Sequence, residues 1–212
     1  NPITKITLPS TIKTIGGYAF LGCSNLTNIE GLSGCTSIET CAFSGCLSLT
    51  NIDLPACTTI GDRAFGKIEG YDGCPSLTSV NLPECTSLGA DAFDGCRSLT
   101  SIDLSSCEII RKATFYNCRS LKSIDLSSCI EIESGELESG ESAFCFCSSL
   151  TSVYLPKCTK IGRHAFSSCT SLHTVSIPSC TYIGYDIFYD LFNEAGLNIK
   201  EITLNSTTPP TL

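Results

Sequence analysis

The chain has 212 residues, of which 42% are apolar and 16% are charged, so it holds ample material for a packed core and intrinsic disorder is not expected. Its formal net charge of −8 argues against a broad surface for nucleic acid or anionic membranes, because their phosphates would be repelled. No apolar run approaches the roughly 20 residues that cross a bilayer, so this segment is not expected to insert into a membrane.

A repeat of 22 or 23 residues dominates the sequence. Residues 77–98 read LTSVNLPECTSLGADAFDGCRS, and residues 99–120 read LTSIDLSSCEIIRKATFYNCRS. Eight such units start at residues 3, 26, 49, 77, 99, 121, 150 and 172, with a trailing strand from residue 199. Insertions at 66–73, 133–141 and 189–198 interrupt the period. Because one unit cannot bury its own apolar face, the units are predicted to stack into a single solenoid domain over residues 1–212.

Each unit is predicted to open with a short strand. Apolar residues alternate with polar ones there, as at Ile52 and Leu54, which is the pattern of a half-buried strand. Pro55 and its equivalents end the strand because proline lacks the N–H of a sheet residue. A T-x-I-G bend follows, and then an Ala-Phe pair such as Ala64 and Phe65 that fills the interior. The sequence therefore predicts a mostly β solenoid with one short parallel strand per coil, and with turns and single helical turns on the other side.

Sixteen cysteines are the second regular feature. Fourteen of them form two columns, one after the strand (Cys35, Cys57, Cys85, Cys107, Cys129, Cys158, Cys180) and one after the phenylalanine (Cys23, Cys46, Cys74, Cys96, Cys118, Cys147, Cys169). Stacked coils would hold neighbouring Cβ atoms about 4.8 Å apart, whereas a disulfide prefers about 3.8 Å, so the pattern favours free thiols that pack the core. Disulfides and a metal site are the alternatives. No C-x-x-C pair supports the metal.

Polar side chains on the predicted strands form the first candidate binding surface. The third and fifth residues of each unit should face solvent and stack into a polar stripe. The residues singled out for binding are Glu30, Asp53, Asn81, Asp103, Asp125 and Tyr154. The acidic members would suit a basic partner or, less well, Ca²⁺. A solvated sheet face without any ligand explains the same polarity.

The insertions are the second candidate, because loops on a rigid scaffold often carry recognition residues. Tyr71, Leu137 and Phe192 would be their apolar tips, and Tyr71 and Phe192 are taken as candidate binding residues. Tolerated variation in loop length is the alternative. Neither His164 nor His173 lies near a sequence motif for a nucleophile, and no cofactor or metal motif occurs, so neither an enzyme nor a cofactor is predicted.

The I-G-x-x-A-F signature at 15–20, 60–65 and 161–166 resembles that of the BspA-like, or Treponema-type, leucine-rich repeat family of surface proteins, over practically the whole chain. The resemblance implies a right-handed leucine-rich repeat solenoid that is secreted or on the cell surface and binds a protein or glycan partner in adhesion, without catalysis. The closing TLNSTTPPTL looks like the start of a further unit, so a fragment of a longer array is expected. The alternatives are a spacer segment of a surface stalk and a thiol-based redox or metal-binding protein.

Overall fold

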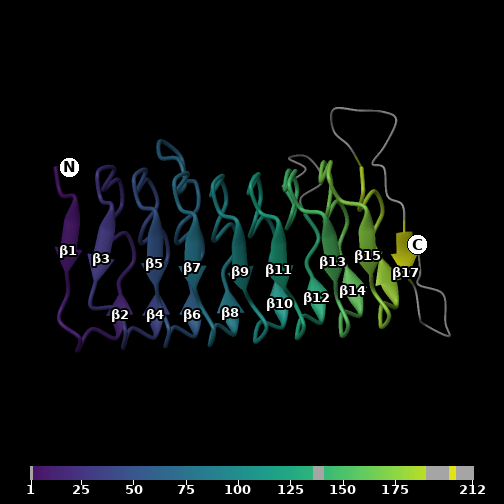
Figure 1. Cartoon of the computed structure of the whole chain (residues 1–212), viewed down its shortest axis with the longest axis horizontal. Helices are drawn as coiled ribbons and strands as arrows, with labels where there is room; N and C mark the ends of the chain where they lie inside the picture. Colours follow the sequence, from purple (N-terminus) through teal and green to yellow (C-terminus); the bar gives the residue numbers. More distant parts are fainter. Residues whose placement is uncertain (1, 136–140, 190–200, 204–212) are drawn as a thin grey trace.

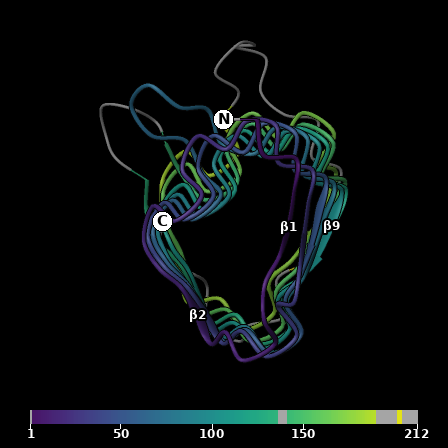
Figure 2. The same cartoon turned by 90° about the vertical axis from the view of Figure 1, so that its left-hand side faces the viewer.

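The computed structural model describes residues 2–135, 141–189 and 201–203. The chain forms a solenoid of about eight turns, with its coils stacked side by side from β1 at one end to β17 at the other (Figure 1). Along the stacking axis the coils superpose into one closed outline, with β1 and β9 on one wall and β2 on the opposite one (Figure 2).

The longer strand of each coil has three residues, and its middle residue is buried or half-buried from β1 to β15. Each of these strands starts two residues after a predicted unit start. They are β1 (Lys5–Thr7), β3 (Asn28–Glu30), β5 (Asn51–Asp53), β7 (Ser79–Asn81), β9 (Ser101–Asp103), β11 (Ser123–Asp125), β13 (Ser152–Tyr154), β15 (Thr174–Ser176) and β17 (Glu201–Thr203).

A second strand of two residues runs along the opposite wall of each coil. These strands are β2 (Thr14–Ile15), β4 (Ser37–Ile38), β6 (Thr59–Ile60), β8 (Ser87–Leu88), β10 (Ile109–Ile110), β12 (Glu131–Ile132), β14 (Lys160–Ile161) and β16 (Tyr182–Ile183). The sequence predicts only one strand per coil, so the structure adds a second sheet. At some of these strands a glycine follows and lies close to the preceding coil. A Cβ atom on Gly89, for example, would lie 2.3 Å from the Asp62 nitrogen.

All strand pairs are parallel and join equivalent residues of adjacent coils, as Ile52 joins Val80. The longer strands form the sheets β1-β3, β5-β7-β9-β11 and β13-β15-β17, and the shorter ones form β2-β4-β6-β8 and β10-β12-β14-β16. The predicted in-register stack is therefore confirmed. The long-strand sheet is interrupted between β3 and β5 and between β11 and β13, and the short-strand sheet is interrupted between β8 and β10.

Phenylalanine rings form one continuous interior file, as the repeat predicts. From Phe20 to Phe166 the centroids of successive rings lie 5.1 to 5.5 Å apart, and Phe188 follows at 6.2 Å. Several neighbouring rings are almost parallel, with 2° between the planes of Phe43 and Phe65. This offset stacking adds to the apolar burial that each ring contributes.

Both cysteine columns are buried, as predicted, and all sixteen cysteines are free thiols. In the column after the strand, each Sγ donates to the carbonyl two residues later, as Cys57 does to Thr59 at 3.3 Å. In the column after the phenylalanine, from Cys46 onward, each Sγ donates to the phenylalanine carbonyl of the preceding coil, as Cys118 does to Phe93 at 3.2 Å. A repeated carbonyl acceptor explains why these slots hold a thiol rather than an alkyl group.

The segments for which the sequence predicts single helical turns are hydrogen-bonded turns. The Ala42 N–H donates to the Glu39 carbonyl at 3.3 Å, while the Phe43 N–H donates to the Ala64 carbonyl of the next coil at 2.7 Å. Because such N–H groups bond between coils, the turn does not continue as a helix. The described residues contain no helix, and hence none long and apolar enough to span a bilayer.

Candidate binding surface

The first and third residues of the longer strands point outward, as predicted. In β5, β7, β9 and β13 both are exposed and the residue between them is buried. In β15 both are half-buried. Because equivalent residues of adjacent coils stand side by side, the exposed ones form the predicted polar stripe on one wall of the solenoid (Figure 2).

Three of the predicted binding residues border one hollow of about 670 Å³, here called the strand-face hollow. Asp103 of β9 and Asp125 of β11 stand opposite each other in the paired strands. Tyr154 of β13, across the break in the sheet, borders the same hollow and is 61% exposed. Two carboxylates and an aromatic ring are therefore available to a single ligand.

The backbone holds both carboxylates of the strand-face hollow in place. Oδ1 of Asp103 accepts a hydrogen bond from the Ser105 N–H at 2.9 Å, and Oδ1 of Asp125 accepts one from the Ser127 N–H at 2.9 Å. Within the part of the chain that the structure describes, no ion pair neutralises either carboxylate. Like charges on adjacent strands repel, so a cationic ligand would relieve an unfavourable contact.

The other acidic residues of the stripe already have partners. Glu30 pairs with Lys5 at 2.7 Å, and the hydrogen bond and charge of Lys5 lower the pKa of the Glu30 carboxyl. Asn81 Nδ2 donates to Asp53 Oδ1 at 2.7 Å. Glu30 and Asp53 border a separate, smaller hollow of about 310 Å³. Five of the six predicted strand-face residues thus border two separate hollows, and Asn81 borders neither of them.

Of the predicted loop residues, the structure describes Tyr71, which does not border the strand-face hollow. Tyr71 lies on the 66–73 loop, which the backbone of Ile68 and Tyr71 closes with two hydrogen bonds of 3.0 Å. The Tyr71 ring packs against the chain at Gly22 and Gly45, where a Cβ atom would come within 2.6 and 2.8 Å of it. Tyr71 remains 44% exposed. Phe192 and Leu137 lie outside the described residues.

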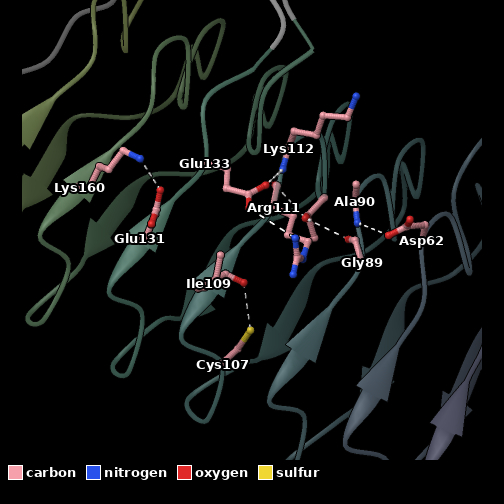
Figure 3. Close-up of polar contacts among 11 residues, drawn as sticks. Asp62, Gly89, Ala90, Cys107, Ile109, Arg111, Lys112, Glu131, Glu133 and Lys160 are labelled. Carbon is pink, nitrogen blue, oxygen red and sulfur yellow. Dashed lines mark hydrogen bonds and ion pairs between the residues drawn. The ribbon is translucent and has the colours of Figure 1, made fainter.

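The second sheet carries a set of charged contacts between coils that were not singled out from the sequence (Figure 3). Lys160 Nζ pairs with Glu131 at 2.6 Å, and the hydrogen bond and charge of Glu131 raise the pKa of Lys160. Glu133 pairs with Arg111 at 3.5 Å and accepts the Lys112 N–H at 3.2 Å. Opposite charges about one repeat apart are the sequence signal that would have found them. These contacts pair acidic with basic side chains on the second sheet, whereas the described residues give the two carboxylates of the strand-face hollow no ion-pair partner.

The histidines make local packing and hydrogen-bond contacts, and the two cysteines described next have raised pKa values. His164 packs edge-on against Tyr185, with ring centroids 5.5 Å apart, and Nδ1 of His173 lies 3.0 Å from the Ser171 carbonyl oxygen. Burial raises the pKa of Cys46 and of Cys145 to about 12. Among the residues that the structure describes, no group of three or more His, Cys, Asp or Glu is placed to hold a metal ion.

Stacked coils of this length with an in-register parallel sheet and an interior phenylalanine file define a leucine-rich repeat solenoid. The chain belongs to the family of the BspA type leucine rich repeat region, which matches six copies over residues 1–70 and 67–194. Leucine-rich repeat proteins of this kind are generally protein-interaction modules.

Several solved structures share the fold. A leucine rich repeat protein of T. pallidum is 26% identical, with a TM-score of 0.57 over 80% of this chain and 64% of that one. The chain thus spans about two thirds of the length of the T. pallidum protein. The pneumococcal vaccine antigen PcpA is 17% identical, with a TM-score of 0.54 over 97% of this chain and 57% of that one. No curated protein matches the chain significantly.

Proposed function

We propose that the chain is a non-enzymatic, extracellular interaction module that binds a protein partner, as in adhesion, through the strand-face hollow. The observation that carries this proposal is the meeting of Asp103, Asp125 and the exposed ring of Tyr154 around one hollow. Membership of a family of repeat proteins that are generally interaction modules supports the binding role, and the surface proteins of that family support the location.

The chemistry of the hollow favours a basic partner over a glycan. A lysine or arginine side chain can pair with a carboxylate while its stem or guanidinium group lies over an aromatic face. The net charge of −8 would also attract a basic protein over a distance of about 10 Å at moderate salt. A glycan can also stack on the tyrosine and donate its hydroxyl groups to the carboxylates, but only a cationic ligand also relieves the repulsion between the two carboxylates.

An array of purified extracellular proteins, probed with the whole chain and then with variants, tests the proposal. The double variant Asp103→Asn and Asp125→Asn should lose binding to the captured protein by about tenfold or more, since each removed ion pair weakens attraction and slows association. Asp53→Asn is the matched control, because Asp53 stands in the same column but outside the hollow, and it should bind like the wild type.

Three results would count against the proposal. Binding that the double variant retains would place the partner elsewhere on the molecule. The chain could bind no protein on the array but bind a glycan array, and lose that binding in Tyr154→Ala. This result would show that the partner is a carbohydrate and not a protein. Absence of binding on both arrays would favour the alternative of a spacer segment in a surface stalk.

A further inference from the structure

A second concave site lies under the 66–73 loop, here called the loop cavity. Its volume is about 450 Å³. Its lining comes from the Ala-Phe turns of three coils, from the 66–73 loop and from Glu141 at the end of the second insertion. Figure 2 shows the 66–73 loop, in blue, projecting away from the wall that β1 and β9 occupy. The loop cavity is therefore separate from the strand-face hollow.

The charges that line the loop cavity are unbalanced. Five carboxylates face three cationic side chains. Asp91 is only 6% exposed, and it uses one of those cations because its Oδ2 lies 3.4 Å from Arg63 Nη2. Arg63 and Asp91 occupy the same slot in successive coils, with φ angles of 53° and 56°, so the repeat itself brings this pair together. The Arg63 charge is thus already committed at one side of the cavity.

Asp94 differs from Asp91 in lacking such a partner, and it differs from the exposed Glu69 and Asp72 in being half-buried. It lines the cavity and is half-buried, and its side chain forms no hydrogen bond or ion pair within the described ranges. Burial raises the pKa of Asp94 to about 7, and the negative charges of Asp91 and Glu141 add to that rise, while Lys67 and Arg63 oppose it. With this pKa, Asp94 gains or loses a proton near neutral pH in the folded chain. A bound cation would take the place of that proton.

We propose that the loop cavity binds a primary ammonium group, with Asp94 as its principal counter-charge and with Asp91 and Glu141 beside it. An ammonium group has three N–H donors that diverge, which suits carboxylates arriving from different coils. A bare metal ion is a poorer match, because no described set of three acidic, cysteine or histidine residues is placed to hold one. The ammonium group would come from a lysine side chain of a partner protein or from a small polyamine.

Calorimetric titration of the whole chain tests this proposal with two probes, spermidine and the tripeptide acetyl-Gly-Lys-Gly-amide. The two probes distinguish a polyamine from a lysine side chain as the source of the ammonium group. The same tripeptide acetylated on its lysine carries no cation, so it tests whether binding needs the charge. An ammonium probe should bind about tenfold more tightly at pH 8 than at pH 6, because at pH 6 it must displace the proton of Asp94. The acetylated tripeptide should not bind.

Variants locate the site. Asp94→Asn keeps the shape of the side chain, and it should weaken binding at pH 8 by about tenfold or more and remove the pH dependence. Glu141→Gln provides a second variant with a smaller loss, and Asp103→Asn on the strand face should bind like the wild type. Thermal unfolding of each variant checks that it is folded.

Each outcome decides the question. Binding of spermidine alone identifies a small polyamine as the ligand source, and binding of the lysine tripeptide identifies a protein side chain. Absence of binding for both probes at pH 8 overturns the proposal, as does equal affinity of Asp94→Asn and the wild type. Equal binding of the acetylated tripeptide also overturns it. None of these results depends on the strand-face hollow.

Discussion

The thiol of Cys118 donates a hydrogen bond to the carbonyl of Phe93, one coil earlier, over 3.2 Å, and both side chains are fully buried. Cys118→Ala removes this donor and leaves a small void, so it should lower the free energy of unfolding by about 1–2 kcal/mol. Urea denaturation followed by circular dichroism measures the change. Ser123→Ala on the exposed side of β11 is the control, with an expected change below about 0.5 kcal/mol. Equal stability of Cys118→Ala and the wild type would contradict the packing role of the column.

The thiols should be inert while the chain is folded. All sixteen cysteines are buried, and burial raises the pKa of Cys46, Cys96 and Cys145 to about 12, so these thiols hold little reactive thiolate at pH 8. Cys158 differs, because a hydrogen bond with Cys129 lowers its pKa, and there burial alone keeps reagents away. A thiol reagent such as Ellman's reagent should label the native chain only slowly, and it should label all sixteen positions rapidly in denaturant. Fast labelling of two or more thiols in the native chain would instead favour the redox alternative.

Two glycines in the same slot of different coils should respond oppositely to alanine. A Cβ atom on Gly89 would lie 2.3 Å from the backbone nitrogen of Asp62, so Gly89→Ala must push two coils apart and should cost about 3 kcal/mol or prevent folding. The nearest atom to a Cβ on Gly16 is Oε2 of Glu39, at 3.8 Å. Gly16→Ala should therefore be neutral or stabilising by about 0.4–1 kcal/mol. Melting temperatures of the two variants decide this, and similar losses would contradict it.

Asp94 should make the chain less stable as the pH rises. Its carboxyl keeps a proton up to about pH 7 in the folded chain, whereas an unfolded aspartate releases it near pH 4. Between these values the folded state binds more protons than the unfolded state, so the free energy of unfolding falls as pH increases. Asp94→Asn, which stays neutral, should raise the melting temperature at pH 7.5 and change it much less at pH 5. An equal change at both pH values would show that the effect is not electrostatic.

Much of the fold could be predicted because repetition places equivalent residues in equivalent environments. The starts of the strands, the interior file from Phe20 onward and the buried cysteine columns all follow from the period alone. The shorter sheet was harder to predict. Its strands have only two residues, too few to show an alternating pattern, and the sequence predicts only a bend there.

The candidate sites depend on residues that break the repeat, and this limited their prediction. The polar stripe follows from alternation, but the strand-face hollow joins Asp125 and Tyr154, which lie on either side of the break between β11 and β13. The loop cavity likewise joins Asp94 to Glu141, which lie two units apart in sequence and belong to no shared motif. Spatial proximity of this kind leaves no signal in the spacing of residues along the chain.

The phenylalanine file has a consequence for how such genes change. Each ring meets a similar ring on either side, so loss of the residues from 44 to 65 would set Phe43 against Phe93 in nearly the geometry that Phe65 has now. Whole units can then be duplicated or deleted by recombination while the interior stays matched. Evolution could thereby lengthen or shorten the polar stripe by one strand at a time.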